Sequence, residues 1–336
     1  MKPENAEYNS LKTRQTVSKR ASRTGMTLAM TLLIAAVSLS SFGFCALQAK
    51  TSAKKQAENS ASRTVLSDAL STMAVHLRDT VEKSTQPDEE KINQREKPEQ
   101  ISDETFYALK EAALTPGPDQ QKAYVLFLDA DQYTDALLAF FLRDPDRYDF
   151  IRTWPQSADA QYQTPVSSLQ ESLESVPRLL QWDVRWGWQP LADTMIWVGG
   201  CGPTCLSMVA SWLKQDPTLT PRVLTDLDVA LGDYYSGMGT SSAFFPEAAA
   251  ALDLNCETLP VDTNALRQAL EAGKPVILHM LPGTFTRTGH FIVATGLENG
   301  QLRINDPNSI RHSDTLWDID AVLSECSELW AFSNPQ

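Results

Sequence analysis

One stretch of the chain, residues 26–49, carries no charged side chain at any of its 24 positions. A helix of that length would extend about 36 Å, enough to cross a hydrocarbon core of about 30 Å. The 25 residues before it hold six basic residues and two acidic ones, which favours a cytoplasmic N-terminus. The sequence therefore predicts a cytoplasmic tail at 1–25 and a transmembrane signal-anchor at 26–49.

A cleaved signal peptide is the competing interpretation of the same stretch. The tail and the apolar run are both long for a signal peptide, and Leu47 stands where cleavage favours a small residue. Both interpretations place the remainder of the chain outside the membrane. We expect a single-pass protein of the cell membrane with an extracellular C-terminal part.

The rest of the chain has the composition of a folded protein. Hydrophobic residues make up 42% of the 336 positions and charged residues 21%, which is enough apolar material for a packed core. The formal net charge of −13 opposes a nucleic-acid partner, because phosphate binding needs a concentrated basic face. Five cysteines are too few for a disulfide-built scaffold, although Cys256 and Cys326 could pair outside the cell.

Three segments follow the predicted anchor. Residues 50–104 are polar and charged, with helical apolar spacing at 64–82, which indicates a stalk; 87–104 has the composition of a linker. Residues 105–176 form a helical region and a connector, in which we expect a platform for the next domain and no polar group that does chemistry. Residues 177–336 form the last domain.

The last domain has an α+β pattern. Helices are predicted after Cys201 and at 264–272, and strands at 275–281, 290–297 and 302–306. Because the helices come first and the strands are joined by a hairpin signal, the sheet should be antiparallel.

Cys201 lies in the sequence GGCGPTC, where Pro203 and the glycines favour a helix start. A cysteine at a helix N-terminus faces unpaired N–H groups and the positive end of the helix dipole, which favour the thiolate and make a nucleophile. A buried structural cysteine in a glycine-rich turn is the alternative, and these residues alone leave the two open.

His290 is the best candidate for a base beside this cysteine. It begins a predicted strand directly after Gly289, where a sheet would hold it and a cleft could expose it. The other histidines fit less well: His76 lies in the stalk, His279 in an apolar strand, and His312 in a polar stretch that indicates the surface.

Asp306 could orient His290 if the hairpin has a suitable register. A three-residue loop at 298–300 would place Asp306 opposite Ile292, on the face of His290. A two-residue Asn-Gly turn would shift the register and separate the two side chains. The aspartate also precedes Pro307 in a turn sequence, so an ordinary turn aspartate is the alternative.

Two further site hypotheses concern an oxyanion donor and a metal. The amide of Gln181, with the backbone N–H of Cys201, could hold a developing negative oxygen. Cys201 and Cys205 have the spacing C-x3-C, which structural zinc sites rarely use, so we expect no metal and no cofactor. Cys205 is more simply a packed core thiol.

Several segments together resemble the double-glycine-leader-peptidase-like proteins, a family C thirty-nine-like branch of the papain-fold cysteine peptidases. The resemblance covers roughly residues 177–333 and rests on these segments in order: LLQWDVRWGW, VGGCGPTCLSMVASWL, GTSSAFF, GKPVILHMLPGTFTRTGHFIVATGLENGQLRINDPNS and LW-AFS. It implies a papain-like α+β fold with Cys201 as nucleophile and His290 as general base. Asp306 would orient the base and Gln181 would serve the oxyanion hole.

The function implied is a membrane-anchored cysteine peptidase that acts on peptides, proteins or a cell-wall component. A catalytically inactive binding module, and a cell-wall amidase or transpeptidase with the same site, are the alternatives. Ser242 stands where the family often has an aromatic residue, and no phosphate-binding GxxxxGK[ST] loop occurs, so the chain is not itself an ATP-driven exporter. We expect the loop 232–245 to border the substrate cleft, although an ordinary surface loop is the alternative.

Overall fold

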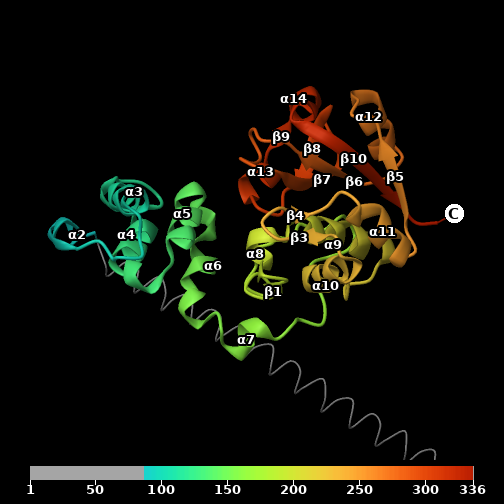
Figure 1. Ribbon diagram of the computed structural model, residues 1–336. Helices are drawn as coiled ribbons and strands as arrows, with labels where there is room; N and C mark the ends of the chain where they lie inside the picture. Colours follow the sequence, from blue (N-terminus) through green and yellow to red (C-terminus); the bar gives the residue numbers. More distant parts are fainter. Residues whose placement is uncertain (1–86, 336) are drawn as a thin grey trace, which may run out of the picture. The chain divides into compact units, whose positions relative to one another are not determined.

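The computed structural model describes residues 87–335 (Figure 1). The predicted tail, the predicted anchor at 26–49 and the stalk helix at 64–82 lie outside the described residues. Among the helices of the described part, none is long and apolar enough to cross a membrane.

The first part of the described chain is a cluster of short helices. Capping residues begin several of them: the side chains of Asp88, Ser102 and Thr134 accept hydrogen bonds from backbone N–H groups of the first turn. The helices share one apolar core. Their bounds are α2 (Glu89–Gln94), α3 (Asp103–Leu114), α4 (Gln120–Leu128), η1 (Ala130–Gln132), α5 (Asp135–Arg143), η2 (Pro145–Arg147), α6 (Tyr148–Arg152), η3 (Trp154–Gln156) and α7 (Ala160–Gln163).

Residues 87–104 differ from the linker that their composition predicts. They contain α2 and the start of α3, and the side chains of Ile92 and Ile101 are buried in the helical core. Two isolated apolar residues among many charges carry little weight in composition, but each fills a place in a core that the following helices supply.

The C-terminal part is built on a six-stranded antiparallel sheet in the order β5-β10-β6-β7-β8-β9. Its strands are β5 (Asn255–Leu259), β6 (Val276–Met280), β7 (His290–Glu298), β8 (Gln301–Asn305), β9 (Leu316–Trp317) and β10 (Cys326–Ser333). The three strands predicted from the sequence are the adjacent strands β6, β7 and β8. The small pairs β1 (Pro190–Leu191) with β2 (Thr194–Met195), and β3 (Tyr234–Tyr235) with β4 (Gly239–Thr240), are separate.

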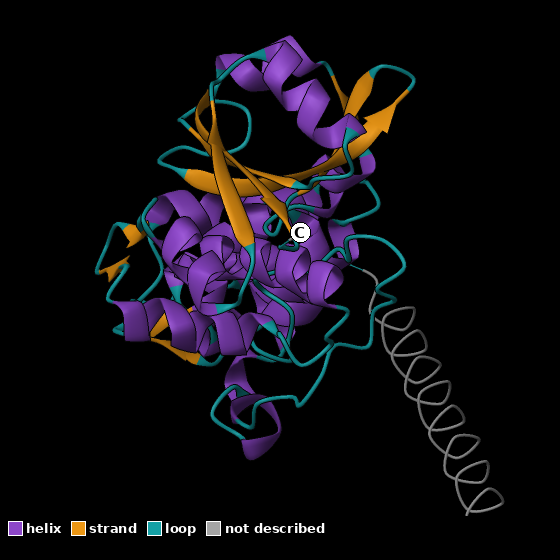
Figure 2. Cartoon of the chain, turned by 90° about the vertical axis from the view of Figure 1, so that its right-hand side faces the viewer, coloured by secondary structure: helices purple, strands orange, loops and turns teal. Residues whose placement is uncertain are grey.

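Helices cover both faces of this sheet (Figure 2). On one face, α9 (Cys201–Lys214), α10 (Pro221–Leu231) and α11 (Phe244–Ala251) pack on side chains such as Phe291 and Val293. On the other, α12 (Thr263–Glu271) and α14 (Ile319–Ser324) pack on Ile292 and Ala294. Alternate residues of β7 thus enter two different cores, as the two-residue period of a strand requires. The short helices α8 (Ile196–Gly199) and α13 (Ile310–Asp314) flank the sequence-predicted site.

The β7–β8 hairpin has the shorter of the two turns that the sequence left open, and it still aligns His290 with Asp306. Glu298 pairs with Gln301, so the turn has two residues, and Asn299 and Gly300 both have positive φ. The register then shifts between Ala294 and Gly296, which is a β-bulge at Thr295. The bulge restores the residue that the shorter turn omits, so that Val293 pairs with Asn305 and the next step brings Asp306 opposite Ile292.

The possible disulfide between Cys256 and Cys326 is not formed. Cys256 pairs with Phe332 on β10, whereas Cys326 begins that strand and pairs with Met280. Six residues of extended strand span about 20 Å, far beyond disulfide geometry. The four described cysteines are all free thiols.

Candidate active site

Cys201 is the first residue of α9, and its position depends on two glycines with little space around them. A Cβ atom added at Gly202 would lie 2.9 Å from the Cβ of Thr240, and one at Gly200 would lie 2.5 Å from the carbonyl oxygen of Ile196. The absence of these side chains lets the helix start pack against β4 and α8. Cys201 remains partly exposed, whereas Cys205, one turn later, is fully buried in the core.

His290 begins β7 and lies between Cys201 and Asp306. Its Nε2 is 2.7 Å from Oδ1 of Asp306, and the side chain of Cys201 is close enough to interact with its ring. Because Nε2 faces the carboxylate, Nδ1 is the ring nitrogen on the side of Cys201. The structure thus places the three residues in series.

The charge of Asp306 decides the protonation of His290. Burial of the imidazole alone would lower its pKa, because a buried cation loses hydration. The attraction of Asp306, its hydrogen bond and the interaction with Cys201 act more strongly together and raise the pKa of His290 from 6.5 to about 10. Burial raises the pKa of Asp306, but His290, His312 and the backbone N–H of Asn308 together lower it well below its ordinary value of 3.8. The pair is therefore an imidazolium and a carboxylate at neutral pH.

Asp306 also binds a second histidine. Nδ1 of His312, on α13, lies 2.7 Å from Oδ2 of Asp306, so each carboxylate oxygen has its own imidazole. The ring of His312 makes edge contacts with Phe285 and Trp317. The polar stretch around His312 predicted a surface position; the sequence signal for its role was its place six residues after Asp306.

Hydrogen bonds also fix the backbone around Asp306. The N–H of Asp306 donates to Oγ of Ser313 at 2.9 Å, and the N–H of Asn308 donates to Oδ1 of Asp306 at 2.8 Å. With an exposed fraction of 1%, the carboxylate depends on these partners rather than on water.

Gln181 connects the two sides of the site. Its backbone N–H donates to the carbonyl of Pro307 at 2.8 Å, and its Nε2 donates to the carbonyl of Trp197 at 2.8 Å. Trp197 belongs to α8 and lies four residues before Cys201, and Pro307 directly follows Asp306. The Oε1 atom is buried without a hydrogen-bond partner. The structure therefore ties Gln181 to both segments, and its role as an oxyanion donor stays a prediction.

The loop 232–245 lies against the turn that carries Cys201. A Cβ added at Gly199 would be 3.3 Å from the ring of Tyr234, and Thr240 packs on Gly202. Met238 at the tip of the loop is 88% exposed. A role as the border of a substrate cleft stays a prediction.

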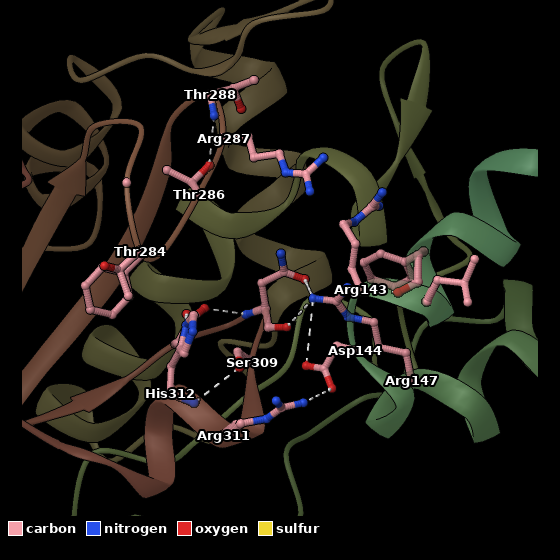
Figure 3. Close-up of a pocket in the computed structure, with 16 residues that line it drawn as sticks. Arg143, Asp144, Arg147, Thr284, Thr286, Arg287, Thr288, Ser309, Arg311 and His312 are labelled. Atoms are coloured by element: carbon pink, nitrogen blue, oxygen red, sulfur yellow. Dashed lines mark hydrogen bonds and ion pairs between the residues drawn. The ribbon is translucent and has the colours of Figure 1, made fainter. Parts of the chain in front are cut away.

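A cavity of about 730 Å³ adjoins the other side of Asp306 (Figure 3). Its walls are the end of α5 and η2 from the helical region, the loop 283–288 before His290, and residues 306–312. Arg143, Asp144 and Arg147 of the helical region reach it, although the sequence analysis expected no chemically active polar group there. Sequence spacing gave no signal for this cavity, because the wall at residues 140–147 lies more than 100 residues before the other two walls.

Residues 173–334 match the model of the Peptidase_C39 like family. This part of the chain is similar to that family. The family lies within the cysteine peptidases, and the fold is accordingly a C39-like peptidase fold with mixed helices and an antiparallel sheet. The resemblance to C39-like peptidases that the sequence motifs indicated is confirmed. The helical region with Arg143 and Arg147 precedes the matched residues.

Similar solved structures include the peptidase domain of Streptococcus ComA, described as a bi-functional ABC transporter involved in a quorum sensing pathway. It is 24% identical over 41% of this chain and 93% of that chain, with a TM-score of 0.34. The Streptococcus mutans ComA peptidase domain with a small-molecule inhibitor is 27% identical over 31% and 81%, with a TM-score of 0.26. A Bacillus anthracis protein assigned as a C39-like peptidase is 16% identical over 48% and 96%, with a TM-score of 0.33. No curated protein matches the chain.

Proposed function

We propose that the C39-like domain is an active cysteine peptidase that cleaves peptide bonds by acyl transfer with a Cys201–His290–Asp306 triad. The observation that carries the proposal is the position of His290, which contacts Cys201 at the start of α9 and Asp306 at 2.7 Å. A nucleophile, a base and an orienting carboxylate in series are the components of thiol acyl transfer, as in the papain-like peptidases.

The reaction begins with Cys201 as a thiolate, after its proton has passed to the imidazole of His290. The sulfur attacks the scissile carbonyl carbon, and the negative oxygen that forms accepts hydrogen bonds from the Gln181 amide and the backbone N–H of Cys201. His290 gives its proton to the departing amine as the carbon–nitrogen bond breaks, which leaves a thioester on Cys201. His290 then removes a proton from water, the hydroxide attacks the thioester, and the acid is released with the thiol restored.

Asp306 keeps the imidazole of His290 in the orientation that this sequence of steps needs. Its Oδ1 atom fixes Nε2, which leaves Nδ1 toward Cys201. His312 and the backbone N–H of Asn308 fix the carboxylate in turn. We propose in addition that residues 26–49 anchor the chain in the cell membrane with the peptidase domain outside, on the ground of their uncharged length and the basic residues before them.

The test is cleavage of an unbiased substrate set by the full chain. A peptide mixture from a digested proteome is incubated with the wild type, Cys201→Ala and Cys256→Ala, and new N-termini are counted by mass spectrometry. We expect cleavage by the wild type and Cys256→Ala and none by Cys201→Ala, with similar unfolding temperatures. Cleavage that persists in Cys201→Ala would exclude the assigned nucleophile.

Two other outcomes identify the alternative functions. Binding of peptides without any cleavage by the wild type would favour the binding module. Release of amines or cross-linked products from cell-wall fragments, with no cleavage of ordinary peptides, would favour the amidase or transpeptidase, because the nucleophile and base are the same.

A further inference from the structure

The cavity beside Asp306 is positively charged although the chain is acidic. Its charged lining comprises four arginines and two aspartates, whereas the formal net charge of the whole chain is −13. Both aspartates already have partners: Asp306 binds His290 and His312, and Asp144 lies 4.0 Å from Arg147 and 3.4 Å from Arg311. The two aspartates therefore leave a net positive charge on the lining of the cavity.

Arg143 and Arg287 carry this unbalanced charge. Within residues 87–335, neither guanidinium has an ion pair with a carboxylate. They come from opposite walls, α5 and the loop before His290, and extend toward one another across the cavity (Figure 3). Partial burial and the charge of Arg287 lower the pKa of Arg143, so each cation feels the other. An anion between them would relieve this repulsion.

Arg147 makes the wall between them rigid. Its side chain is buried, stacks 3.8 Å from the Phe140 ring and donates to both oxygens of Asn308, the second residue after Asp306. Its Nε atom is buried without an acceptor in the described chain. The helical region and the segment that carries Asp306 are thereby joined at the cavity, so a group bound there lies next to Asp306 of the proposed triad.

We propose that this cavity binds a carboxylate of the peptide substrate, held by Arg143 and Arg287, and so gives the peptidase a preference for acidic peptides. The inference rests on the proposed function, since it assigns a substrate class to the proposed peptidase. A volume of about 730 Å³ lies in the range of small-ligand sites and accommodates a side chain with neighbouring backbone. The carboxylate is either an acidic side chain or the free C-terminus, and the test separates these sources.

The test measures binding rather than cleavage. The full chain with Cys201→Ala is titrated into three sets of rhodamine-labelled octapeptides, and fluorescence anisotropy gives the affinities. One set carries two Glu residues and a C-terminal amide, the second carries Gln in their place, and the third carries Gln with a free C-terminal carboxylate. We expect one of the two carboxylate sets to bind about tenfold more tightly than the Gln amide set, the effect of one charge-assisted hydrogen-bond pair.

The variants locate the effect. In the Cys201→Ala background, Arg143→Gln and Arg287→Gln should each remove most of the preference, and Arg287→Lys should retain part of it. Arg303→Gln is the matched control: it removes an equal charge from an exposed arginine that pairs with Glu298 on the β7–β8 hairpin, and it should leave the preference intact. Unfolding temperatures of all variants show whether each is folded.

The proposal is overturned if neither carboxylate set binds better than the Gln amide set, or if Arg303→Gln lowers the preference as much as the cavity variants. Displacement by inorganic phosphate without any carboxylate preference would also overturn it. Because the protein in this test lacks the nucleophile, a failure to find peptidase activity leaves the binding result standing. Conversely, peptidase activity without an acidic preference would contradict only this inference.

Discussion

Asp306→Asn isolates the charge that the site depends on, because asparagine has nearly the same shape. In the wild type, burial lowers the pKa of His290, but the charge and hydrogen bond of Asp306 outweigh burial. The pKa of His290 therefore rises from 6.5 to about 10. At about 1.4 kcal/mol per pKa unit, the folded protein gains about 4 kcal/mol at pH 7 from protonated His290. Asparagine removes most of this gain, so the free energy of unfolding should fall by about that amount, which corresponds to roughly 10 °C in Tm.

The pH dependence follows from the two pKa shifts. The raised pKa of His290 contributes stability that is complete below pH 6.5 and is lost as the pH rises through about 10. The lowered pKa of Asp306 contributes stability that is present above pH 3.8 and is lost as the pH falls below that value. The difference between wild type and Asp306→Asn should therefore be largest between about pH 4 and 6.5 and shrink on both sides.

Two assays check this prediction on the full chain. Urea unfolding at several pH values gives the stability difference, and NMR of ¹³C-labelled histidine gives the titration of His290. In Asp306→Asn, the burial of the ring should bring the pKa of His290 below 6.5. Asp314→Asn, which removes an exposed carboxylate paired with Arg178, is the matched control and should change stability by less than about 1 kcal/mol. Titration of His290 near pH 6.5 in both the wild type and Asp306→Asn would refute the reasoning.

Three further predictions concern the surroundings of the site. His312→Gln should keep the fold and lower the rate of any cleavage severalfold, and an unchanged pH–rate profile would contradict its role in holding Asp306. Asp228→Asn should raise Tm at pH 7.5 but not at pH 4: burial raises the pKa of Asp228 to about 6, so the carboxyl favours folding only while protonated; thermal unfolding at the two pH values measures this. Gly202→Ala should lower the free energy of unfolding by about 1–3 kcal/mol, because its Cβ would overlap the side chain of Thr240; equal urea midpoints would disprove the steric argument.

The sequence allowed the chemistry of the site to be predicted because local signals carry it. Glycines around Cys201 predict a helix start, and alternating apolar residues predict the strand that begins at His290. The pairing with Asp306 needed the hairpin register, which the sequence left open between a two-residue and a three-residue turn, and the structure has the two-residue turn. The bulge at Thr295 gives the same alignment by another route, and no pattern in the residues distinguishes a bulge from a longer turn.

The features that escaped prediction all depend on contacts between distant segments. β10, an interior strand of eight residues, follows a helix, so its place between β5 and β6 comes only from long-range pairing. His312 and the arginine cavity are likewise defined by what lies next to them in space. Ile92 and Ile101 lie in a stretch rich in charge, and only the helical core shows why they are apolar.

The rate at which Cys201 reacts with iodoacetamide at pH 6.5 tests the central claim most directly. Mass spectrometry assigns the label to each cysteine of the full chain, in the wild type and in His290→Ala, with buried Cys205 as an internal control. A free thiol with a pKa of about 8.5 is about 1% thiolate at this pH. If Cys201 and His290 form a thiolate–imidazolium pair, the wild type should react about tenfold faster than free cysteine, after allowance for the lower nucleophilicity of a stabilised thiolate. In His290→Ala, Cys201 should react no faster than free cysteine. Equal, slow labelling of Cys201 in both proteins would contradict the pair and with it the proposed peptidase.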